Sequence, residues 1–493
     1  MSDVTQTVDN VALLPAYLAA GTAVLVLLAD LFIARRGVTV AVLAAGAVAT
    51  AAGAILVGLD GPRETFCVPA ACSYLATGRS ALVATLFALL TLGVLALSAP
   101  ILRSDQVPAG EYSFLLAASM TGGVVLGAAG DLITLIVALE TLTLPLYVLV
   151  GLRRRSVASA EAAVTFFVVS VVATAVTLLG AALLYAVTGT VHLRTLATAF
   201  AEDGRLLEVP LTAAAVGLVV LGLAFKVAAV PFHAWAPATY DGAPVPVAAY
   251  LSTASKLGGV VALLAVIAAL PATVTGPVLA ILAVLTMTVG NLVALRQTGM
   301  VRLLAWSSVA QAGYILAPLG GLALAAGRTP EVVGAAVTAT VAYAVFFVVM
   351  EFTAFGAVIA LRPPGADGGS IEAYRGVARR RPLVGAAFVF ALVGLAGLPP
   401  GLAGLFAKVV VVRSLIGGDA GWLALVVALN AVVGLAYYVR VAATLYTAPD
   451  VSLDSSPSSG PRSWAVAMAL AVATVLAVVV GFAPQLVLDA AAW

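Results

Sequence analysis

The stretch of sequence that decides the fold spans residues 226–259 and reads KVAAVPFHAWAPATYDGAPVPVAAYLSTASKLGG. It carries Lys226 and Lys256 in otherwise apolar sequence, and Pro231 follows Lys226 by five residues. A proline at that spacing removes the hydrogen bond to the carbonyl of Val227, so we expect the helix to break beside the charge. Broken helices at membrane depth are tolerated only where they face protein or water. The stretch therefore indicates a polar path through an apolar helix bundle.

The composition of the whole chain agrees with a membrane setting. Of its 493 residues, 63% are hydrophobic and 9% are charged. Soluble domains carry roughly a quarter charged residues, so a soluble globular protein is excluded, and so is a disordered chain. The net charge of +2 leaves no basic footprint, and we expect no nucleic-acid partner. The lipid bilayer is the expected surrounding.

Apolar runs of about 20 residues recur along the chain, and each is long enough to span a bilayer. They predict an all-α polytopic membrane protein with about 14 transmembrane helices, in one integral membrane domain covering residues 1–493. The runs are 11–34, 38–59, 81–102, 113–128, 131–151, 161–188, 211–230, 244–270, 275–296, 302–323, 332–361, 383–416, 420–446 and 463–486.

The arginines predict the orientation of these spans. Fifteen of the 21 arginines lie in or near connections between an odd-numbered span and the next even-numbered one. Cytoplasmic loops carry an excess of arginine and lysine. We therefore expect the N and C termini on the non-cytoplasmic side.

Two groups of five spans show the same pattern. The first group, 113–270, contains the broken helix with Lys226, and the second, 275–446, contains one with Lys408 in the equivalent place. An offset of five spans reverses direction, so we expect two inverted five-helix repeats. The spans in 11–102 form an N-terminal group of three, and 463–486 is a C-terminal helix.

The lysines are distributed differently from the arginines. The chain has three lysines among 24 basic residues, Lys226, Lys256 and Lys408, and all three lie inside apolar spans. A guanidinium stays protonated, whereas a desolvated ammonium can release its proton. The placement predicts a proton relay. The alternative is three helix-packing lysines, each paired with a carboxylate.

One carboxylate lies deep in a span and is the expected counterpart of these lysines. Glu140 is central in 131–151, whereas Asp131 is expected to cap that helix. Asp30 and Glu351 lie nearer the ends of their spans, and we expect structural pairing for both.

Prolines accompany three of the four relay candidates. Pro145 follows Glu140 by five residues, as Pro231 follows Lys226, and Pro399–Pro400 precedes Lys408. We expect helix breaks at Pro145, Pro231, Pro399 and Pro400, although ordinary proline kinks are common in transmembrane helices.

Other polar residues could extend the path, with water bridging between them. His233, just past Pro231, can relay protons near neutral pH and is an auxiliary candidate. Ser307 and Gln311 share a helix face, as do Ser252 and Lys256. For the remaining candidates core packing is the more probable role; they are Thr141, Thr143, Tyr147, Thr174 and Tyr343.

Cofactor ligands are scarce. Cys67, Cys72, His192 and His233 are too few and too scattered for an iron–sulfur cluster or a zinc site. No glycine-rich phosphate loop occurs, so we expect no cofactor and no metal in this chain. The two cysteines fall in the outer loop 60–80, where a local disulfide and two unpaired thiols are both open.

Four ordered motifs resemble one family. Besides 226–259, they are ALETLTLPLYVLVG (138–151), GNLVALRQTGMVRLLAWSSVAQAGY (290–314) and YRGVARRRPLVGAAFVFALVGLAGLPPGLAGLFAK (374–408). Together they resemble the antiporter-like subunits of respiratory complex I, and subunit N more than subunits L or M. The resemblance is strong over 110–446. The outer loop with its two cysteines departs from the family pattern.

The resemblance implies a function and a setting. It implies a proton-translocating subunit of NADH–quinone oxidoreductase in a bacterial plasma (inner) membrane, with Glu140, Lys226, Lys256 and Lys408 at the family's relay positions and His233 at its auxiliary histidine. NAD, FMN, Fe–S clusters and quinone would belong to partner subunits, both membrane and peripheral, including neighbouring antiporter-like subunits. A subunit of a multi-subunit cation/proton antiporter, a related membrane-bound hydrogenase or dehydrogenase, and a non-transporting structural subunit remain the alternatives.

Overall fold

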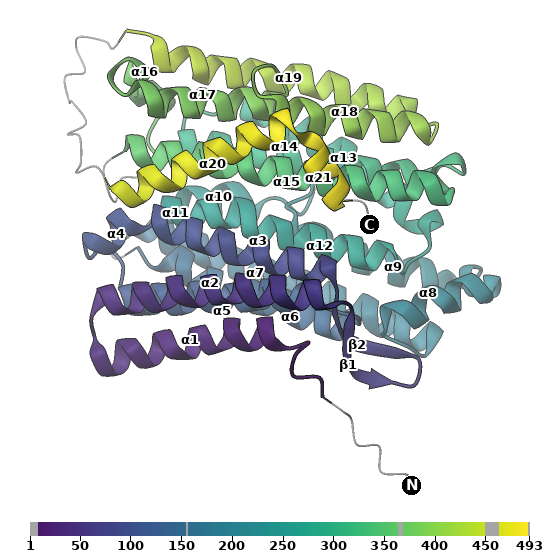
Figure 1. The fold of residues 1–493 in the computed structure, drawn as a ribbon. Coiled ribbons are helices and arrows are strands. Elements are labelled where there is room, and N and C mark those ends of the chain that lie inside the picture. The colour runs from purple at the N-terminus through teal and green to yellow at the C-terminus, as the bar shows by residue number, and fades with distance from the viewer. Residues whose placement is uncertain (1–7, 154–155, 363–367, 449–462, 492–493) are drawn as a thin grey trace.

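The computed structural model describes residues 8–153, 156–362, 368–448 and 463–491. Its long helices run side by side, and the connections gather at two opposite ends of the molecule (Figure 1). The helices of 12 residues or more are α1 (Leu14–Ile33), α2 (Arg36–Asp60), α3 (Gly78–Leu97), α5 (Ala109–Leu126), α6 (Leu132–Gly151), α7 (Val157–Thr188), α9 (Pro210–Lys226), α12 (Lys256–Ile267), α13 (Ala272–Ala294), α14 (Met300–Gly320), α15 (Pro330–Leu361), α17 (Pro382–Ala396), α18 (Leu402–Gly417), α19 (Gly421–Tyr446) and α20 (Trp464–Phe482).

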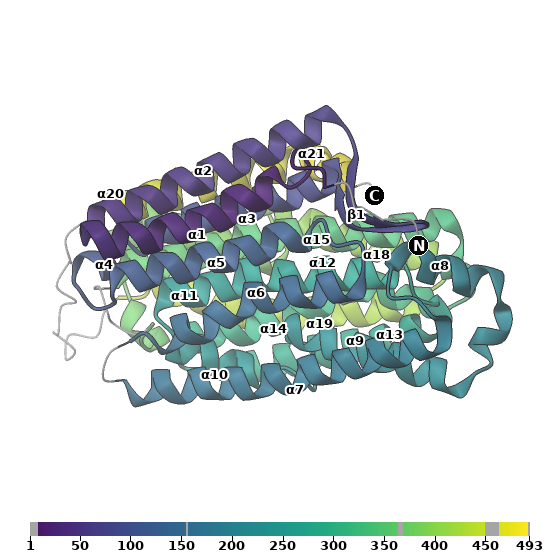
Figure 2. The ribbon, with the colours of Figure 1, turned by 90° about the horizontal axis from the view of Figure 1, so that it is seen from below.

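Shorter elements connect these helices. They are α4 (Ala99–Arg103), α8 (Leu193–Glu202), α10 (Trp235–Gly242), α11 (Val245–Tyr250), α16 (Val377–Arg380) and α21 (Pro484–Ala491), together with two strands, β1 (Arg63–Val68) and β2 (Ala71–Ala76). The hairpin, the start of α1 and α21 lie at the same end of the bundle (Figures 1 and 2).

The prediction of a helical, polytopic membrane protein is confirmed. Within the described residues, eleven helical segments are long and apolar enough to cross a membrane, one of them formed by α11 and α12 together. The apolar helices α9 and α17 are shorter, with 17 and 15 residues. α14 has 21 residues but carries Ser307, Ser308 and Gln311 on its buried surface. The number of fourteen spans stays a prediction.

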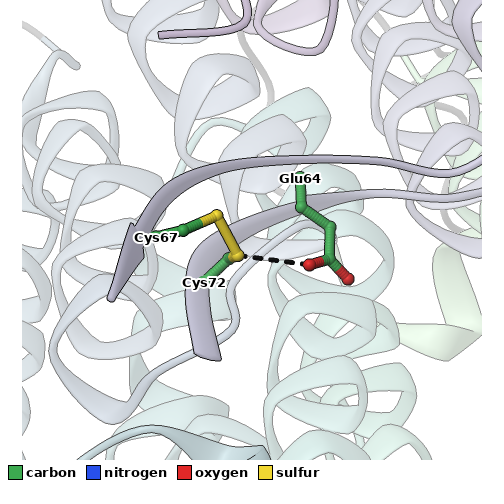
Figure 3. A group of neighbouring side chains, drawn as sticks. All are labelled: Glu64, Cys67 and Cys72. Atoms are coloured by element: carbon green, nitrogen blue, oxygen red, sulfur yellow. Dashed lines mark hydrogen bonds between the residues drawn. A yellow bond between two sulfur atoms is a disulfide. The ribbon is translucent and has the colours of Figure 1, made fainter. Parts of the chain in front are cut away.

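The loop between α2 and α3 adds two short strands to this helical fold. Residues 63–76 form a two-stranded antiparallel hairpin, in which Cys67 is paired with Cys72. A disulfide joins these two residues, and its S–S distance is 2.04 Å (Figure 3). Of the two alternatives for the cysteines, the disulfide is confirmed and the unpaired thiols are wrong. Glu64 Oε2 lies 3.1 Å from Cys72 Sγ, but sulfurs joined in a disulfide are not available as metal ligands.

The hairpin fastens neighbouring loops to the bundle. The backbone N–H of Gly130 donates to the carbonyl of Ser73 at 2.8 Å, at the start of α6. At the other edge, Arg63 pairs with Asp9 at 3.0 Å, ahead of α1. The backbone N–H of Ala12 and the Arg63 guanidinium hold the pKa of the Asp9 carboxyl below its usual range. These contacts explain why a hairpin forms in a loop that joins two long helices.

Two helices end where proline was expected to break them. α9 ends at Lys226, ahead of the cis peptide bond Val230–Pro231. α17 ends at Ala396, ahead of the cis bond Pro399–Pro400, and α18 begins at Leu402.

The predicted break at Pro145 is wrong. α6 runs without interruption from Leu132 to Gly151 with Pro145 inside it. A transmembrane helix tolerates one missing backbone hydrogen bond when neighbouring groups satisfy the freed carbonyl.

The two lysines beside the breaks lie on different sides of their breaks along the chain. Lys226 is the last residue before its break, whereas Lys408 lies after its break, inside α18. Each of the two predicted repeats contains one helix of 32 residues, α7 in the first and α15 in the second. The inverted repeats themselves stay a prediction.

Candidate functional site

A buried ion pair joins Glu140 to Lys226 inside the bundle. Lys226 Nζ lies 2.7 Å from Glu140 Oε1, and the two side chains are 5% and 20% exposed. Glu140 comes from the middle of α6, and Lys226 ends α9. A charge buried without a partner would be costly, and here each residue supplies the opposite charge that the other one needs.

Hydroxyl groups complete the surroundings of this pair. Lys226 Nζ donates to Thr143 Oγ1 and to Ser170 Oγ, both at 3.2 Å. Thr174 Oγ1 donates to Glu140 Oε1 at 2.6 Å. Thr143 and Thr174 are among the candidates that the sequence suggests, whereas Ser170 is a contact that sequence reasoning misses.

Tyr147 and Thr141 differ in their relation to the pair. The hydroxyl of Tyr147 donates to Ser170 Oγ at 2.5 Å and lies 3.5 Å from Glu140 Oε2. Thr141 donates only to the carbonyl of Val137, within its own helix. Tyr147 therefore belongs to the cluster and Thr141 does not.

Lys256 lies at the centre of the bundle and is 2% exposed. Its ammonium donates to the carbonyl oxygen of Ser308 at 2.5 Å and to Ser308 Oγ at 2.6 Å. A π-helical turn, residues 251–255, directly precedes it, and such turns are frequent at functional sites. Among the described residues no carboxylate lies within salt-bridge distance of Lys256. Lys256 therefore differs from Lys226, which forms a direct ion pair.

Lys408 is bound by the broken end of a helix. Its ammonium donates to the carbonyl oxygens of Leu395 and Ala396, at 3.1 and 2.5 Å. These are the last two residues of α17, where carbonyl groups lack helical partners and the helix dipole is negative. The ring of Tyr314 lies beneath the ammonium, 5.3 Å from Nζ to the centroid. The break in the helix thus provides the counter-charge for Lys408.

A chain of hydrogen bonds leads towards Lys408 from the face of α14. Ser307 Oγ and the hydroxyl of Tyr438 are 2.5 Å apart, and Gln311 Nε2 donates to the same hydroxyl at 3.0 Å. Gln311 Nε2 also donates at 3.1 Å to the carbonyl of Leu395, which accepts from Lys408 as well. Ser307 is the neighbour of Ser308, the partner of Lys256. A polar route thus runs from Lys256 to Lys408 with two backbone steps in it, one between Ser308 and Ser307 and one at the carbonyl of Leu395.

Sequence reasoning anticipated part of this route. Ser307 and Gln311 were expected to share a face, and both bond to Tyr438. Tyr343 donates to Gln311 Oε1 at 2.5 Å and so orients the amide. Ser308 and Tyr438 were missed, and the only available signal was their polarity within apolar spans.

The first lysine and His233 are not part of this route. Among the described residues, no hydrogen bond joins the Glu140–Lys226 cluster to Lys256. His233 contacts Trp306, with ring centroids 5.2 Å apart, and its buried Nδ1 has no hydrogen-bond partner in the described part of the chain. The structure brings His233 into contact with none of the three lysines.

Glu351 contradicts its expected role. Its side chain is fully buried in α15, and neither carboxylate oxygen has a hydrogen-bond partner among the described residues. The expected structural pair is therefore absent. Glu351 was judged by its distance from the end of an apolar run, but ten residues of helix at 1.5 Å per residue place it about 15 Å from the end of α15.

A surface groove of about 550 Å³ opens beside Lys408. Its walls are residues of α18 and α19 and the end of α17, and they are apolar except for Lys408 and Arg413. Of the three lysines, Lys408 is therefore the one that reaches the surface of this chain.

The comparisons with known proteins agree with this arrangement. Residues 129–434 match the family model described as NADH:quinone oxidoreductase/Mrp antiporter, TM. The chain is 69% identical to NADH-quinone oxidoreductase subunit N of Salinispora tropica over 99% of both chains. It is 43% identical to subunit N 2 of Streptomyces griseus, over 98% of this chain and 93% of that one.

Solved structures give the same result. A chain of respiratory complex I from Thermus thermophilus is 30% identical, with a TM-score of 0.80 over 97% of this chain and 99% of that chain. A chain of the Mrp complex from Dietzia sp. is 22% identical, with a TM-score of 0.82 over 97% and 96%, a likeness that concerns the fold alone.

The broken helices and buried charges thus define an antiporter-like membrane subunit. More particularly, the chain belongs to the NADH-quinone oxidoreductase subunit N family. It is a proton-translocating, multi-pass membrane subunit of complex I, and other complex I subunits are its partners.

Proposed function

We propose that this subunit moves protons through Glu140, Lys226, Lys256 and Lys408. The observation that carries the proposal is the buried ion pair of Glu140 and Lys226 at the end of a broken helix. Ionisable groups inside a membrane protein are costly and usually mark a transport pathway. Here the pair lies in the same bundle as two further buried lysines, and each of them is held by neutral oxygen atoms.

The pair would act as an electrostatic switch. While Glu140 is ionised and close, Lys226 keeps its proton. When the pair is weakened, the buried ammonium loses its counter-charge and its proton is released towards Lys256. Since no hydrogen bond bridges this gap among the described residues, transfer requires bridging water or side-chain movement.

The second half of the transfer is supported by the route along α14. A proton leaving Lys256 would reach Lys408 through the hydroxyl groups of Ser308, Ser307 and Tyr438, with Gln311 holding Tyr438 in place. Water would bridge the two gaps that no hydrogen bond spans, from Ser308 to Ser307 and from Tyr438 to Lys408. The groove beside Lys408 supports exit from this residue. His233 would be an auxiliary group in this transfer, and His233→Ala in the pumping assay described below tests that role.

The setting follows from the family. We infer a bacterial inner membrane, with both termini and the disulfide hairpin on the non-cytoplasmic side, as the arginine distribution indicates. NAD, FMN, Fe–S clusters and quinone would be bound by partner subunits, whose redox chemistry drives the relay. Within the described part of this chain, the one cluster of potential metal ligands is Glu64 with the two disulfide cysteines, which is no metal site.

The variant Lys256→Ala tests the relay. In the assembled complex in inverted membrane vesicles, it should keep NADH oxidation by an artificial acceptor and lose quinone-coupled proton pumping. Arg194→Ala is the control, since it removes an exposed cation from α8 and should pump normally. Normal pumping by Lys256→Ala would refute the central step. A subunit with a purely structural role would show assembly defects and no separate pumping defect.

A further inference from the structure

The carboxyl group of Glu351 has no role in the relay described above. It is fully buried, about 15 Å along α15 from the end of that helix, and both oxygens lack hydrogen-bond partners in the described part of the chain. An ionised carboxylate in such a place is costly unless a charge compensates it. A buried acid that makes no structural bond requires another explanation.

The neighbours of Glu351 on its own helix show which group it faces. Phe347 and Phe355 lie one turn before and one turn after it on the same face of α15. The ammonium of Lys256 lies 5.6 Å from the centroid of the Phe347 ring. On the other side, the ring of Tyr240 lies 6.5 Å from that of Phe355. Glu351 is therefore between the central lysine and a buried tyrosine.

Packing of the helices and electrostatics agree with this position. α15 packs against α12 and against the π-helical turn that precedes Lys256. Lys256 and Glu351 interact electrostatically, and Lys256 is the cation that faces this carboxylate. Tyr240 on α10 and Tyr438 on α19 also interact with the Glu351 carboxylate. Glu351 is thus the carboxylate that faces the centre of the relay.

We propose that Glu351 is a proton-carrying residue that shares one proton with Lys256. The inference rests on the proposed relay and adds a second titrating group at its central step. The pair is neutral overall whether the proton is on Lys256 Nζ or on a Glu351 oxygen. Unlike Glu140 and Lys226, the two groups are not joined by a short ion pair, so the proton passes between them through a bridging water.

Loading and unloading then use different atoms of the pair. At the start, Lys256 is protonated and Glu351 is ionised. A proton then leaves Lys226, where an N–H bond breaks, and forms an O–H bond on Glu351. The site now carries one excess positive charge, which favours loss of a proton from Lys256 Nζ to the hydroxyl route beginning at Ser308. The proton on Glu351 then passes to Lys256 Nζ and restores the starting state.

The experiment compares Glu351→Gln, which keeps the size of the side chain but cannot carry the proton, with Thr353→Val. Thr353 is a buried neighbour on α15 that bonds only to its own helix, at the carbonyl of Val349. In assembled complex, Glu351→Gln should lower quinone-coupled pumping about tenfold or more and leave NADH oxidation by an artificial acceptor unchanged. Thr353→Val should pump like the wild type.

Two further measurements separate proton carrying from a structural role. Glu351→Asp keeps a carboxyl group and should restore part of the pumping with a shifted pH optimum. Infrared difference spectra of turnover should contain a protonated-carboxyl band that Glu351→Gln lacks. Normal pumping by Glu351→Gln, or a pH profile of Glu351→Asp identical to that of the wild type, would overturn the proposal. If Lys256→Ala also pumps normally, the relay itself has failed; if it does not, only the role of Glu351 is refuted.

Discussion

The carbonyl oxygen of Leu395 accepts hydrogen bonds from both Lys408 and Gln311, each at 3.1 Å. This carbonyl is free because α17 ends one residue later. A single break in the helix therefore holds the terminal lysine and connects it to the polar face of α14. The same break explains why a positive charge is tolerated where the surrounding wall is apolar.

The variant Lys408→Arg separates positive charge from proton release. A guanidinium can occupy the groove and bind the same carbonyls, but it does not deprotonate. We expect the complex to assemble and pumping to fall about tenfold or more. Arg413→Lys, a conservative exchange in the same groove, should pump normally. Unimpaired pumping by Lys408→Arg would show that Lys408 supplies only charge.

Glu140→Gln tests the switch at the other end. The amide keeps a partner for Thr174 but removes the counter-charge of Lys226, so the ion pair is lost. We expect coupled pumping to fall about tenfold or more while artificial-acceptor activity is unchanged. Glu202→Gln, at an exposed position in α8, is the matched control. Equal pumping by the two variants would contradict the switch.

The four relay candidates could be found from the sequence because their cost in a membrane makes them rare. Glu140 and Lys226 are 86 residues apart, and the apolar runs around them place both at membrane depth. Their direct contact, however, follows from the packing of α6, α7 and α9, which no local pattern encodes. The composition of the apolar spans shows which ionisable residues are rare there, whereas the packing of the helices determines which of these residues are in contact.

The residues that were missed share a physical cause. Serine, threonine and tyrosine are common in transmembrane helices, where their hydroxyls often bond to the helix backbone, as Thr141 does. Ser170 and Ser308 have the same chemistry but face a lysine. The depth of Glu351 could be obtained from the sequence, since the predicted run 332–361 and α15 end at the same residue, but its lack of a hydrogen-bond partner depends on how the helices pack. In the hairpin, the strands are six residues each and are stabilised by contacts with distant loops.

Tyr438→Phe tests the hydroxyl route between the second and third lysines. The variant keeps the ring but removes the hydroxyl that bonds to Ser307 and Gln311. We expect pumping to slow severalfold without loss of assembly, because water can replace part of the connection. The control is Tyr112→Phe, which removes the hydroxyl of another buried tyrosine, one that bonds to Ser98 and to no residue of the route. The difference between the two variants is the measured quantity; if they slow pumping equally, the route is wrong.

Cys72→Ser tests the orientation of the chain in the membrane. The chain has two cysteines, so this variant leaves Cys67 as its single thiol, and Cys67 is exposed on the hairpin. A membrane-impermeant maleimide should label Cys67 in intact spheroplasts, and in inverted vesicles only after detergent is added. The reverse pattern would place the hairpin, and with it the start of α1 and α21, in the cytoplasm.

The same variant also tests what the disulfide contributes to stability. Closing a loop this short is worth about 2 kcal/mol, so an added protease should cleave the hairpin of the variant faster. Pumping should be unchanged, because the relay residues lie elsewhere.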